Sequence, residues 1–231
     1  MRNLLKTAAA IAMTGWLCSC SGEKTEANYR VIPIPQEIVM AAGSEFTLSS
    51  GVKIIYPEGN EAMQRNARYL ADYLKKATGM DYRVEAGTEG KGNILLQVLP
   101  DAEKPEAYQL KVNGEGVVIS GASEAGVFYG IQTLRKSIPV VAGVEINDAP
   151  RFDYRGAHFD VSRHFFTVDE VKSFIDMMTL HNMNRLHWHI TDDQGWRIEI
   201  KKYPLLTEIG SQRKETVIGR NSGEYDGKPY G

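Results

Sequence analysis

The chain has 231 residues, of which 42% are hydrophobic, so it is long enough to bury a sizeable core in one or two domains. Its 27 basic and 29 acidic residues give a net charge of -2. This balance excludes the basic excess of a nucleic-acid-binding protein, and no block of like charges indicates a disordered tail. The expected partner is therefore a neutral or small molecule.

Residues 1–20 are predicted to be a targeting segment. Arg2 and Lys6 provide a positive start, and the apolar stretch Thr7–Leu17 is too short to span a bilayer as a helix. Leu17-Cys18-Ser19-Cys20 resembles the lipobox of bacterial lipoproteins. That resemblance implies that Cys20 becomes the lipid-anchored first residue of the mature protein, exposed in the periplasm or at the outer membrane of a bacterial envelope.

A plain secretory signal, with both cysteines removed, is the alternative reading of the same segment. The polar residues 21–27 are predicted to be a flexible tether. No cysteine follows Cys20, so neither a disulfide framework nor a cysteine metal site is expected in the mature domain.

Residues 28–148 predict a small α+β domain, in which a mixed sheet is backed by two helices. The first helix follows from apolar residues at helical spacing that end at Gly79, and the second from Ser123 as a capping residue. A hairpin is expected at Asn113-Gly114, because this dipeptide tolerates positive φ. In chain order the expected elements are an extended lead-in over 31–36, strands over 51–56 and 93–99, a helix over 61–78, hairpin strands over 108–112 and 117–120, and a helix that begins after Ser123.

The chain changes character after Asn147-Asp148-Ala149-Pro150, which predicts a boundary. Strands are expected over 154–161 and 184–190, and Thr167–Glu170 has the pattern of a capping box that opens a helix between them. The crossover has the length of a parallel strand–helix–strand unit. Residues 149–231 therefore predict the first two β/α units of a TIM (β/α)8 barrel, truncated at Gly231 and with a long loop after Gly210, and the whole chain is assigned to the α/β class.

Polar groups gather where both predicted barrel strands end, which is where barrel active sites are built. On the second strand His187 and His189 share one face, and Asp192 and Asp193 follow directly. Two interpretations stay open. The histidines and carboxylates bind a divalent metal, or they form a hydrogen-bonding network in which an aspartate orients a catalytic group.

The first strand ends at Arg163, whose guanidinium offers five N–H donors in a rigid fork. This group suits two adjacent sugar hydroxyls, a carboxylate or a phosphate, while a salt bridge to Asp160 is the structural alternative. His158 and Asp160 are either a second metal pair or part of a structural network. Trp196 is expected either to stack on a sugar ring or to cover the base of its loop.

Several of these blocks resemble glycoside hydrolase family 20, the β-N-acetylhexosaminidases. Pro33-Ile34-Pro35-Gln36 resembles the opening of the small N-terminal domain of the family, and the segment 113–134 resembles the end of that domain. The segments 150–165 and 184–196 resemble the first two barrel units, and the last of these blocks is the most specific. The resemblance covers nearly all of the mature chain.

The resemblance implies retaining, substrate-assisted hydrolysis of terminal β-linked N-acetylglucosamine or N-acetylgalactosamine from glycans, without a cofactor or metal. It implies that Arg163 binds the O3 and O4 hydroxyls of the terminal sugar. It also implies that Asp192, rather than Asp193, acts through a histidine on the general acid and tunes its pKa.

The chain departs from the family pattern in one respect. The family has an adjacent Asp-Glu pair near its fourth strand, and no such pair in a His-x-Gly-Gly-Asp-Glu context occurs here; Asp169-Glu170 is explained by the capping box. The chain is therefore expected to be an inactive amino-terminal fragment of an active enzyme. The alternatives are a metal-dependent barrel hydrolase that uses His187 and His189, and a non-catalytic carbohydrate-binding surface lipoprotein.

Overall fold

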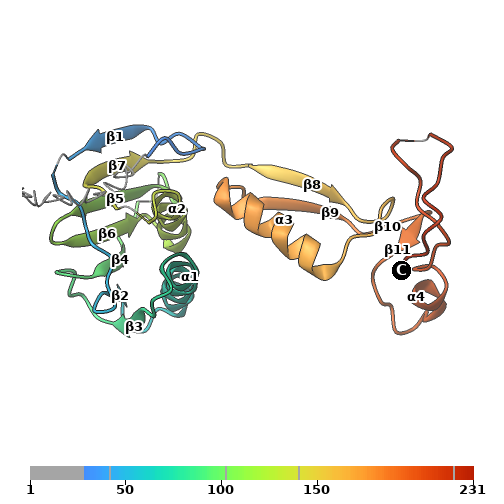
Figure 1. Ribbon diagram of the computed structural model, residues 1–231, viewed down its shortest axis with the longest axis horizontal. Helices are drawn as coiled ribbons and strands as arrows, with labels where there is room; N and C mark the ends of the chain where they lie inside the picture. The colour runs from blue at the N-terminus through green and yellow to red at the C-terminus, as the bar shows by residue number, and fades with distance from the viewer. Residues whose placement is uncertain (1–28, 42, 102, 140, 221) are drawn as a thin grey trace, which may run out of the picture.

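The computed structural model describes residues 29–41, 43–101, 103–139, 141–220 and 222–231. The predicted signal peptide, Cys20 and the tether lie outside these residues. The described chain forms two units that are joined by the segment 149–155 (Figure 1). Within these residues, none of the helices has the length and apolar character that crossing a bilayer requires.

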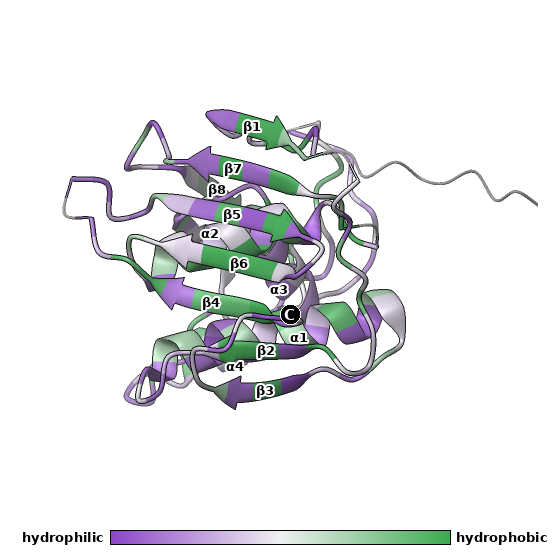
Figure 2. Ribbon diagram, turned by 90° about the vertical axis from the view of Figure 1, so that its left-hand side faces the viewer, coloured by the Kyte–Doolittle hydropathy of each residue, from purple (hydrophilic) through white to green (hydrophobic). Residues whose placement is uncertain are grey.

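The first unit contains the mixed sheet that the sequence predicts. Seven strands lie in the order β1-β7-β5-β6-β4-β2-β3 (Figure 2). The pairs β2–β3, β2–β4 and β4–β6 are parallel, and the pairs β5–β6, β5–β7 and β1–β7 are antiparallel. The strands are β1 (Glu37–Met40), β2 (Lys53–Tyr56), β3 (Arg83–Ala86), β4 (Ile94–Val98), β5 (Tyr108–Asn113), β6 (Gly116–Gly121) and β7 (Val144–Asp148).

Two helices, α1 (Glu61–Thr78) and α2 (Glu124–Arg135), cover one face of this sheet (Figure 1). Gly79 ends α1 in the left-handed conformation, with φ 75°, and the Ser123 side chain accepts from the N–H of Gly126 at the start of α2, so both predicted helix ends are confirmed. The core between helices and sheet consists of fully buried aliphatic side chains, which include Ile54, Met63, Leu70, Leu74, Ile94, Leu96, Leu110, Ile119, Ile131, Leu134 and Ile146.

Three of the seven strands, β1, β3 and β7, are not predicted from the sequence. Asn147 and Asp148, which the sequence assigned to a boundary, are paired residues of β7, opposite Glu37 and Tyr108 respectively. Pairing with β1 and β5 satisfies backbone groups of this segment, and these long-range contacts override the turn preference of Asn and Asp. The boundary therefore begins at Ala149, after β7 has ended.

The predicted hairpin β5–β6 is present, but for a different reason from the one expected. Asn113 pairs with Gly116 across the turn, and neither Asn113 nor Gly114 has a positive φ. The Asn113 side chain instead accepts from the N–H of Glu115 at 2.9 Å. A local side-chain hydrogen bond, rather than left-handed backbone, therefore stabilises this turn.

The second unit contains the predicted strand–helix–strand arrangement. Strands β8 (Gly156–Asp160) and β9 (Arg185–His189) pair in parallel, and α3 (Val168–Leu180) connects them. The capping box at Thr167 and Glu170 is formed on both sides. Phe159 stacks on Phe174 of α3 with ring centroids 4.3 Å apart, so α3 covers one face of the pair and leaves the histidine-bearing face uncovered by it.

Short elements follow β9. They are β10 (Thr191–Asp192), β11 (Gly195–Trp196) and α4 (Leu205–Glu208). In the tail that the sequence assigns to a long loop, bridges join Arg213 to Tyr230 and Val217 to Tyr225, so the segment doubles back without forming a regular strand. These elements and the mixed sheet place the chain in the α/β class, as expected, while the assignment of residues 149–231 to the first two units of a truncated TIM barrel stays a prediction.

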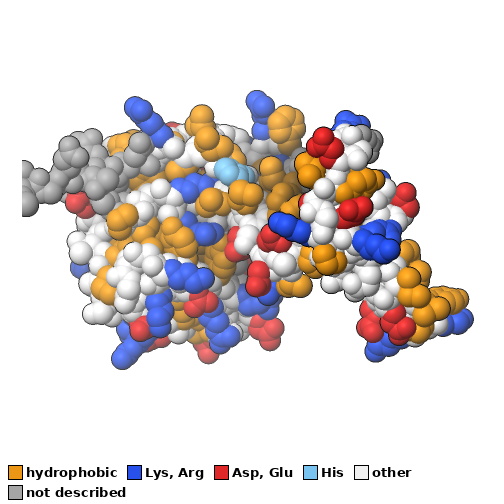
Figure 3. Space-filling model, turned by 45° about the vertical axis from the view of Figure 1, so that its right-hand side comes forward, with side chains coloured by type: hydrophobic (Ala, Val, Ile, Leu, Met, Phe, Trp, Pro, Cys, Tyr) orange, Lys and Arg blue, Asp and Glu red, His pale blue; other side chains and the backbone are white. Residues whose placement is uncertain are grey.

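The two units are joined by a polar contact around Arg155. Its Nη1 lies 2.8 Å from Glu106 Oε2, and its Nε donates to the carbonyl of Asn182. Figure 3 shows acidic and basic side chains interspersed over the visible face, without a patch of a single sign. This agrees with the balanced composition of the chain.

Candidate functional site

The two predicted polar segments meet beyond the carboxyl ends of β8 and β9. Parallel pairing sets Asp160 opposite His189, and the N–H of Val161 donates to the carbonyl of His189 at 3.0 Å. The residues that follow each strand are therefore brought to the same edge of the pair.

Arg163 and Asp192 are in direct contact at this edge. Arg163 Nη2 lies 2.7 Å from Asp192 Oδ2, and Arg163 Nη1 lies 2.8 Å from Asp160 Oδ2. The salt bridge to Asp160, which the sequence left as an alternative, is thus present together with the contact to Asp192. One guanidinium spans two carboxylates that come from different strands.

His189 completes this cluster. Its Nε2 lies 2.8 Å from Asp192 Oδ2 and 2.8 Å from Arg163 Nη1. Since Arg163 can only donate, Nε2 either accepts from the guanidinium or donates to the carboxylate, and the tautomer decides which. The sequence offered His189 as a hydrogen-bonding group or a metal ligand, and the structure places it between Arg163 and Asp192.

Hydrogen bonds and the positive charge of Arg163 lower the pKa of the Asp160 carboxyl group and that of the Asp192 carboxyl group. Partial burial would raise the pKa of Asp160, but N–H donors of Arg163 and Ser162 and the Arg163 guanidinium outweigh burial and lower it. The pKa of Asp192 is lowered first by the backbone N–H of Asp193, then by His189 and by the charge of Arg163. Both carboxylates are therefore ionised at neutral pH and balance the positive charge of Arg163.

Two residues that the sequence analysis did not single out hold the turn that carries Arg163. The Ser162 hydroxyl, which is fully buried, donates to the carbonyl of Gly195 at 2.8 Å. Arg197 donates through Nε to the carbonyl of Val161 at 3.1 Å and through Nη1 to the carbonyl of Ser211 at 2.5 Å. These bonds are long-range, so no local pattern in the sequence could have identified them.

The remaining candidates lie outside this cluster. Asp193 is exposed, and its carbonyl accepts from Arg213. Trp196 donates to the carbonyl of Ile198 at 2.6 Å and lines an apolar cavity of about 520 Å³ with Trp188 and α3 residues. This position favours packing over sugar stacking for Trp196. Cys20 lies outside the described residues.

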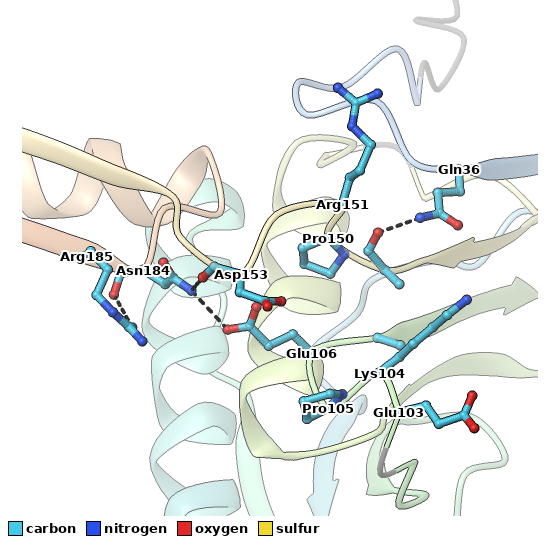
Figure 4. A pocket seen from close by; sticks show the side chains of 12 residues that line it. Gln36, Glu103, Lys104, Pro105, Glu106, Pro150, Arg151, Asp153, Asn184 and Arg185 are labelled. Carbon is cyan, nitrogen blue, oxygen red and sulfur yellow. Dashed lines mark hydrogen bonds between the residues drawn. The ribbon is translucent and has the colours of Figure 1, made fainter.

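A second, more polar cavity of about 430 Å³ lies between the two units (Figure 4). Glu106, Asp153 and Asn184 meet on one side of it, where Asn184 Nδ2 donates to the Glu106 carboxylate at 3.2 Å and to the carbonyl of Asp153 at 2.9 Å. The residues along this wall are occupied in joining the units. Neither cavity is lined by Arg163 or Asp192.

The cluster can bind a polar ligand through Arg163. Of the five guanidinium N–H groups, the contacts to Asp160, His189 and Asp192 use at most three, so at least two donors remain for a ligand. The side chain is 42% exposed, so these donors are accessible to solvent. Sugar hydroxyls are suitable acceptors, because a fork of donors can bond two neighbouring oxygens.

Comparison with known protein families matches both units. Glycosyl hydrolase family 20, domain 2, matches residues 28–149, and Glycosyl hydrolase family 20, catalytic domain, matches residues 152–228. A beta-hexosaminidase of Porphyromonas gingivalis is 40% identical over 210 residues, which are 84% of this chain and 27% of that protein.

Solved structures agree with this match. A mutant Streptomyces plicatus beta-hexosaminidase in complex with product, GlcNAc, has a TM-score of 0.72 at 38% identity, over 83% of this chain and 40% of that one. An exo beta-N-acetylglucosaminidase of Vibrio harveyi in complex with N-acetylglucosamine has a TM-score of 0.71 at 30% identity, over 87% and 32% of the two chains. The chain thus spans between about a quarter and two fifths of the length of these relatives.

Proposed function

Because the chain belongs to glycoside hydrolase family 20, we propose that the whole protein hydrolyses the glycosidic bonds of terminal β-linked N-acetylhexosamine residues. The observation that carries this proposal is the contact of Arg163 with both Asp160 and Asp192 beyond two parallel strands. Its relatives include a beta-hexosaminidase and an enzyme solved with N-acetylglucosamine. The substrates are therefore glycans that end in N-acetylglucosamine or N-acetylgalactosamine.

In this proposal Arg163 binds two adjacent hydroxyls of the terminal sugar through its free N–H donors. Asp160 and Asp192 hold the guanidinium in one orientation, since each accepts from a different nitrogen. Orienting the sugar in this way reduces the entropy that is lost on reaching the transition state.

We propose that bond cleavage is substrate-assisted and retains the anomeric configuration, because it takes two displacements. In the first, the 2-acetamido oxygen of the sugar attacks the anomeric carbon, the bond to the leaving oxygen breaks, and an acid donates a proton to that oxygen. In the second, water attacks the anomeric carbon from the face that the leaving group vacated and gives a proton to the conjugate base of that acid, while the bond to the acetamido oxygen breaks. Asp192 is proposed to act on this acid through a hydrogen-bond network and to tune its pKa. The acid belongs to an Asp-Glu pair that these 231 residues do not contain in the family context.

The test of this function is an assay of the whole protein on a chromogenic β-N-acetylglucosaminide and on matched β-glucosides and β-galactosides. Release of the aglycone from the first substrate alone is expected. Release from the other glycosides without release from the N-acetylated one would refute the assignment. Residues 21–231 by themselves are expected to show no turnover, because the general acid is missing; measurable turnover would show that the acid lies within this chain.

We also propose that Cys20 is lipidated and that the protein is tethered to the bacterial envelope. The lipobox-like segment 17–20 and the polar residues after it support this. Expression in a bacterium supplied with a labelled fatty acid should label the protein, whereas Cys20→Ser should abolish the label and release the protein from membranes. Labelling that persists in Cys20→Ser would contradict the proposed anchor.

A further inference from the structure

We propose that Arg197 is a positioning residue for the hydrolysis and that it acts on the substrate through Arg163. This inference rests on the proposed function, because it assumes that Arg163 binds the terminal sugar. Arg197 directly follows β11, in the loop beyond β9, whereas Arg163 lies in the turn beyond β8. The contacts of Arg197 run to backbone carbonyls of the two residues that precede Arg163.

The turn that carries Arg163 is held from two sides by groups of opposite charge. On one side, the Asp160 carboxylate accepts from the N–H of Ser162 at 2.9 Å and from the N–H of Arg163 at 3.1 Å. On the other side, Arg197 donates through Nε to the carbonyl of Val161 at 3.1 Å, and its Nη2 faces the carbonyl of Ser162 at 3.5 Å.

These four contacts belong to only two peptide groups, the one between Val161 and Ser162 and the one between Ser162 and Arg163. In each of them the N–H faces the Asp160 carboxylate and the carbonyl faces the Arg197 guanidinium. A hydrogen bond to an ionised group is stronger than one between neutral groups. The two charged side chains therefore fix the orientation of both peptides, and with it the direction in which the Arg163 side chain leaves the backbone.

Arg197 is itself held by the chain around it. Its Nη1 donates to the carbonyl of Ser211 at 2.5 Å. The centre of its guanidinium lies 5.3 Å from the ring centroid of Phe165 and 5.3 Å from that of Tyr230, which is within the range of cation–π attraction. The guanidinium is therefore fixed by groups outside the turn, so it can act as a support for the turn.

Gly195 leaves the space that this arrangement needs. A Cβ at this position would overlap Nη2 of Arg197. The carbonyl of Gly195 also accepts from the buried Ser162 hydroxyl at 2.8 Å. Because the guanidinium bonds carbonyls on separate segments, it cannot move aside for a larger residue without releasing one of them.

The position of the turn matters because Arg163 must reach two carboxylates at once. Its Nη1 lies 2.8 Å from Asp160 Oδ2 and its Nη2 lies 2.7 Å from Asp192 Oδ2. A displacement of about 1 Å in a group that orients a substrate can lower the rate by roughly 100-fold. A lysine at position 197 would keep the charge but not the planar fork that bonds several carbonyls in fixed directions.

The test is a double-mutant cycle in the whole protein, with kcat/KM measured on a chromogenic β-N-acetylglucosaminide. Arg197→Lys should lower kcat/KM roughly tenfold, and by no more than Arg163→Ala lowers it. In an Arg163→Ala background the same change should lower kcat/KM less than about twofold, because the group through which Arg197 acts is then absent. Equal losses in the two backgrounds, or an unchanged kcat/KM in Arg197→Lys, would overturn the proposal.

Arg135→Lys is the matched control. The Arg135 guanidinium also lies over two rings, 5.1 Å from the centroid of Tyr69 and 4.3 Å from that of Tyr73, but it belongs to the first unit. This variant should keep kcat/KM within about twofold of the native value, because its site shares no partner with Arg163. A loss as large as that of Arg197→Lys would show a general effect of replacing a packed arginine.

Gly195→Ala provides a second variant in which the guanidinium is displaced rather than removed. It should reproduce the pattern of Arg197→Lys in both backgrounds, and it carries the test if Arg197→Lys does not fold. Thermal unfolding checks the fold of every variant. A native kcat/KM in a folded Gly195→Ala variant would contradict the proposed support of the turn.

A measurement without turnover separates failure of this inference from failure of the proposed function. Carbon-13 NMR should show that the pKa of Asp160 rises in Arg197→Lys but not in Arg135→Lys, because a relaxed turn weakens the N–H donors that lower it. An inactive native protein would refute the proposed function. An unshifted Asp160 midpoint in Arg197→Lys would refute the positioning role alone.

Discussion

At the scale of single residues, the main feature of the molecule is the way Arg163 is held. An arginine near a strand end is free to point in many directions, and its long side chain loses rotamer entropy when it is fixed. Here Asp160, His189 and Asp192 each contact the guanidinium, and Asp160 also accepts from the N–H of Arg163 itself at 3.1 Å. The fork is therefore oriented before any ligand arrives, which reduces the entropic cost of binding.

Replacing Arg163 should impair catalysis by the whole protein. Loss of a charge-assisted hydrogen bond costs about 1.5–3 kcal/mol, so Arg163→Ala should lower kcat/KM on a β-N-acetylglucosaminide roughly 10- to 150-fold. Arg163→Lys should recover only part of this, since an ammonium lacks the planar fork. Arg65→Lys, an exposed position on α1, is the control. Full activity of Arg163→Lys would show that the fork is not needed.

The pH dependence of the cluster follows from its carboxyl groups. The pKa of Asp160 and that of Asp192 are both lowered in the folded chain, below the ordinary 3.8. A lowered folded-state pKa means that the contribution to stability is complete above the unfolded pKa, about 3.9, and is lost as pH falls through the folded value.

Carbon-13 NMR of the aspartate carboxyl groups checks this directly. Both midpoints should lie below 3.8 in the native chain, and Arg163→Ala should raise them, because the guanidinium favours the ionised form of each group. A midpoint for Asp160 that does not move in Arg163→Ala would show that backbone donors alone set its pKa.

At the scale of elements, α3 decides which face of the β8–β9 pair is available. The helix packs on Phe159, so the alternate residues His158 and Asp160 project to the other face. Its start is fixed by Thr167, whose side chain accepts from the N–H of Glu170 at 3.3 Å, and by Glu170, whose carboxylate accepts from the N–H of Thr167 at 2.7 Å. The exposed acidic pair Asp169-Glu170 thus has a structural role at a helix N-terminus.

Removing the cap should destabilise this helix without touching the cluster. Thr167→Ala should lower the free energy of unfolding by about 1 kcal/mol, which urea denaturation can measure. Ser173→Ala in the same helix is the matched control, because its hydroxyl bonds only to the carbonyl of Asp169 within the helix. Equal stability of Thr167→Ala and the native chain would mean that the helix start is held by packing instead.

Across the whole molecule, the partly buried Arg155–Glu106 ion pair joins the two units. Arg155 and Glu106 have side chains only 14% and 26% exposed, and Glu106 also accepts from Asn184 and Tyr129 at 3.2 Å. Burial by itself would raise the pKa of Glu106, but the bonds from Arg155, Asn184 and Tyr129 outweigh it and lower the pKa. The pair is therefore charged at neutral pH and orients β8 against the first unit.

A double-mutant cycle of Glu106→Gln and Arg155→Met should give a coupling energy of about 1–3 kcal/mol, because breaking a poorly solvated pair leaves an unpaired charge. The Lys111–Glu145 pair, 48% and 46% exposed, is the control and should give less than about 1 kcal/mol. Since the pKa of Glu106 is lowered, the first coupling should be complete above the unfolded pKa of about 4.3 and should disappear only as the pH falls through the lower pKa of the folded chain. Equal coupling in both pairs would contradict a special role for this contact.

An element can be located from the sequence when the interactions that fix it are local. Helices α1, α2 and α3 follow from apolar spacing and from caps within a few residues, so the sequence is sufficient to locate them. Strands β1 and β7 pair across more than one hundred positions, Glu37 with Asn147 and Ile38 with Ile146. A four- or five-residue strand with polar residues has no local signal strong enough to show such a partner.

Periodicity, capping and motif spacing are local properties, so the α/β class, the parallel strand–helix–strand unit and the segments that carry Arg163 and Asp192 follow from the amino-acid order alone. The contacts of Asp160 and His189 with Arg163, and the bonds by which Ser162 and Arg197 hold the turn behind it, become visible in the folded chain. The grouping of His158 with His187 and His189 on one face of the β8–β9 pair is likewise a property of the folded chain. Contact between side chains depends on strand register and on which face a helix covers, and chain folding sets both over long sequence separations.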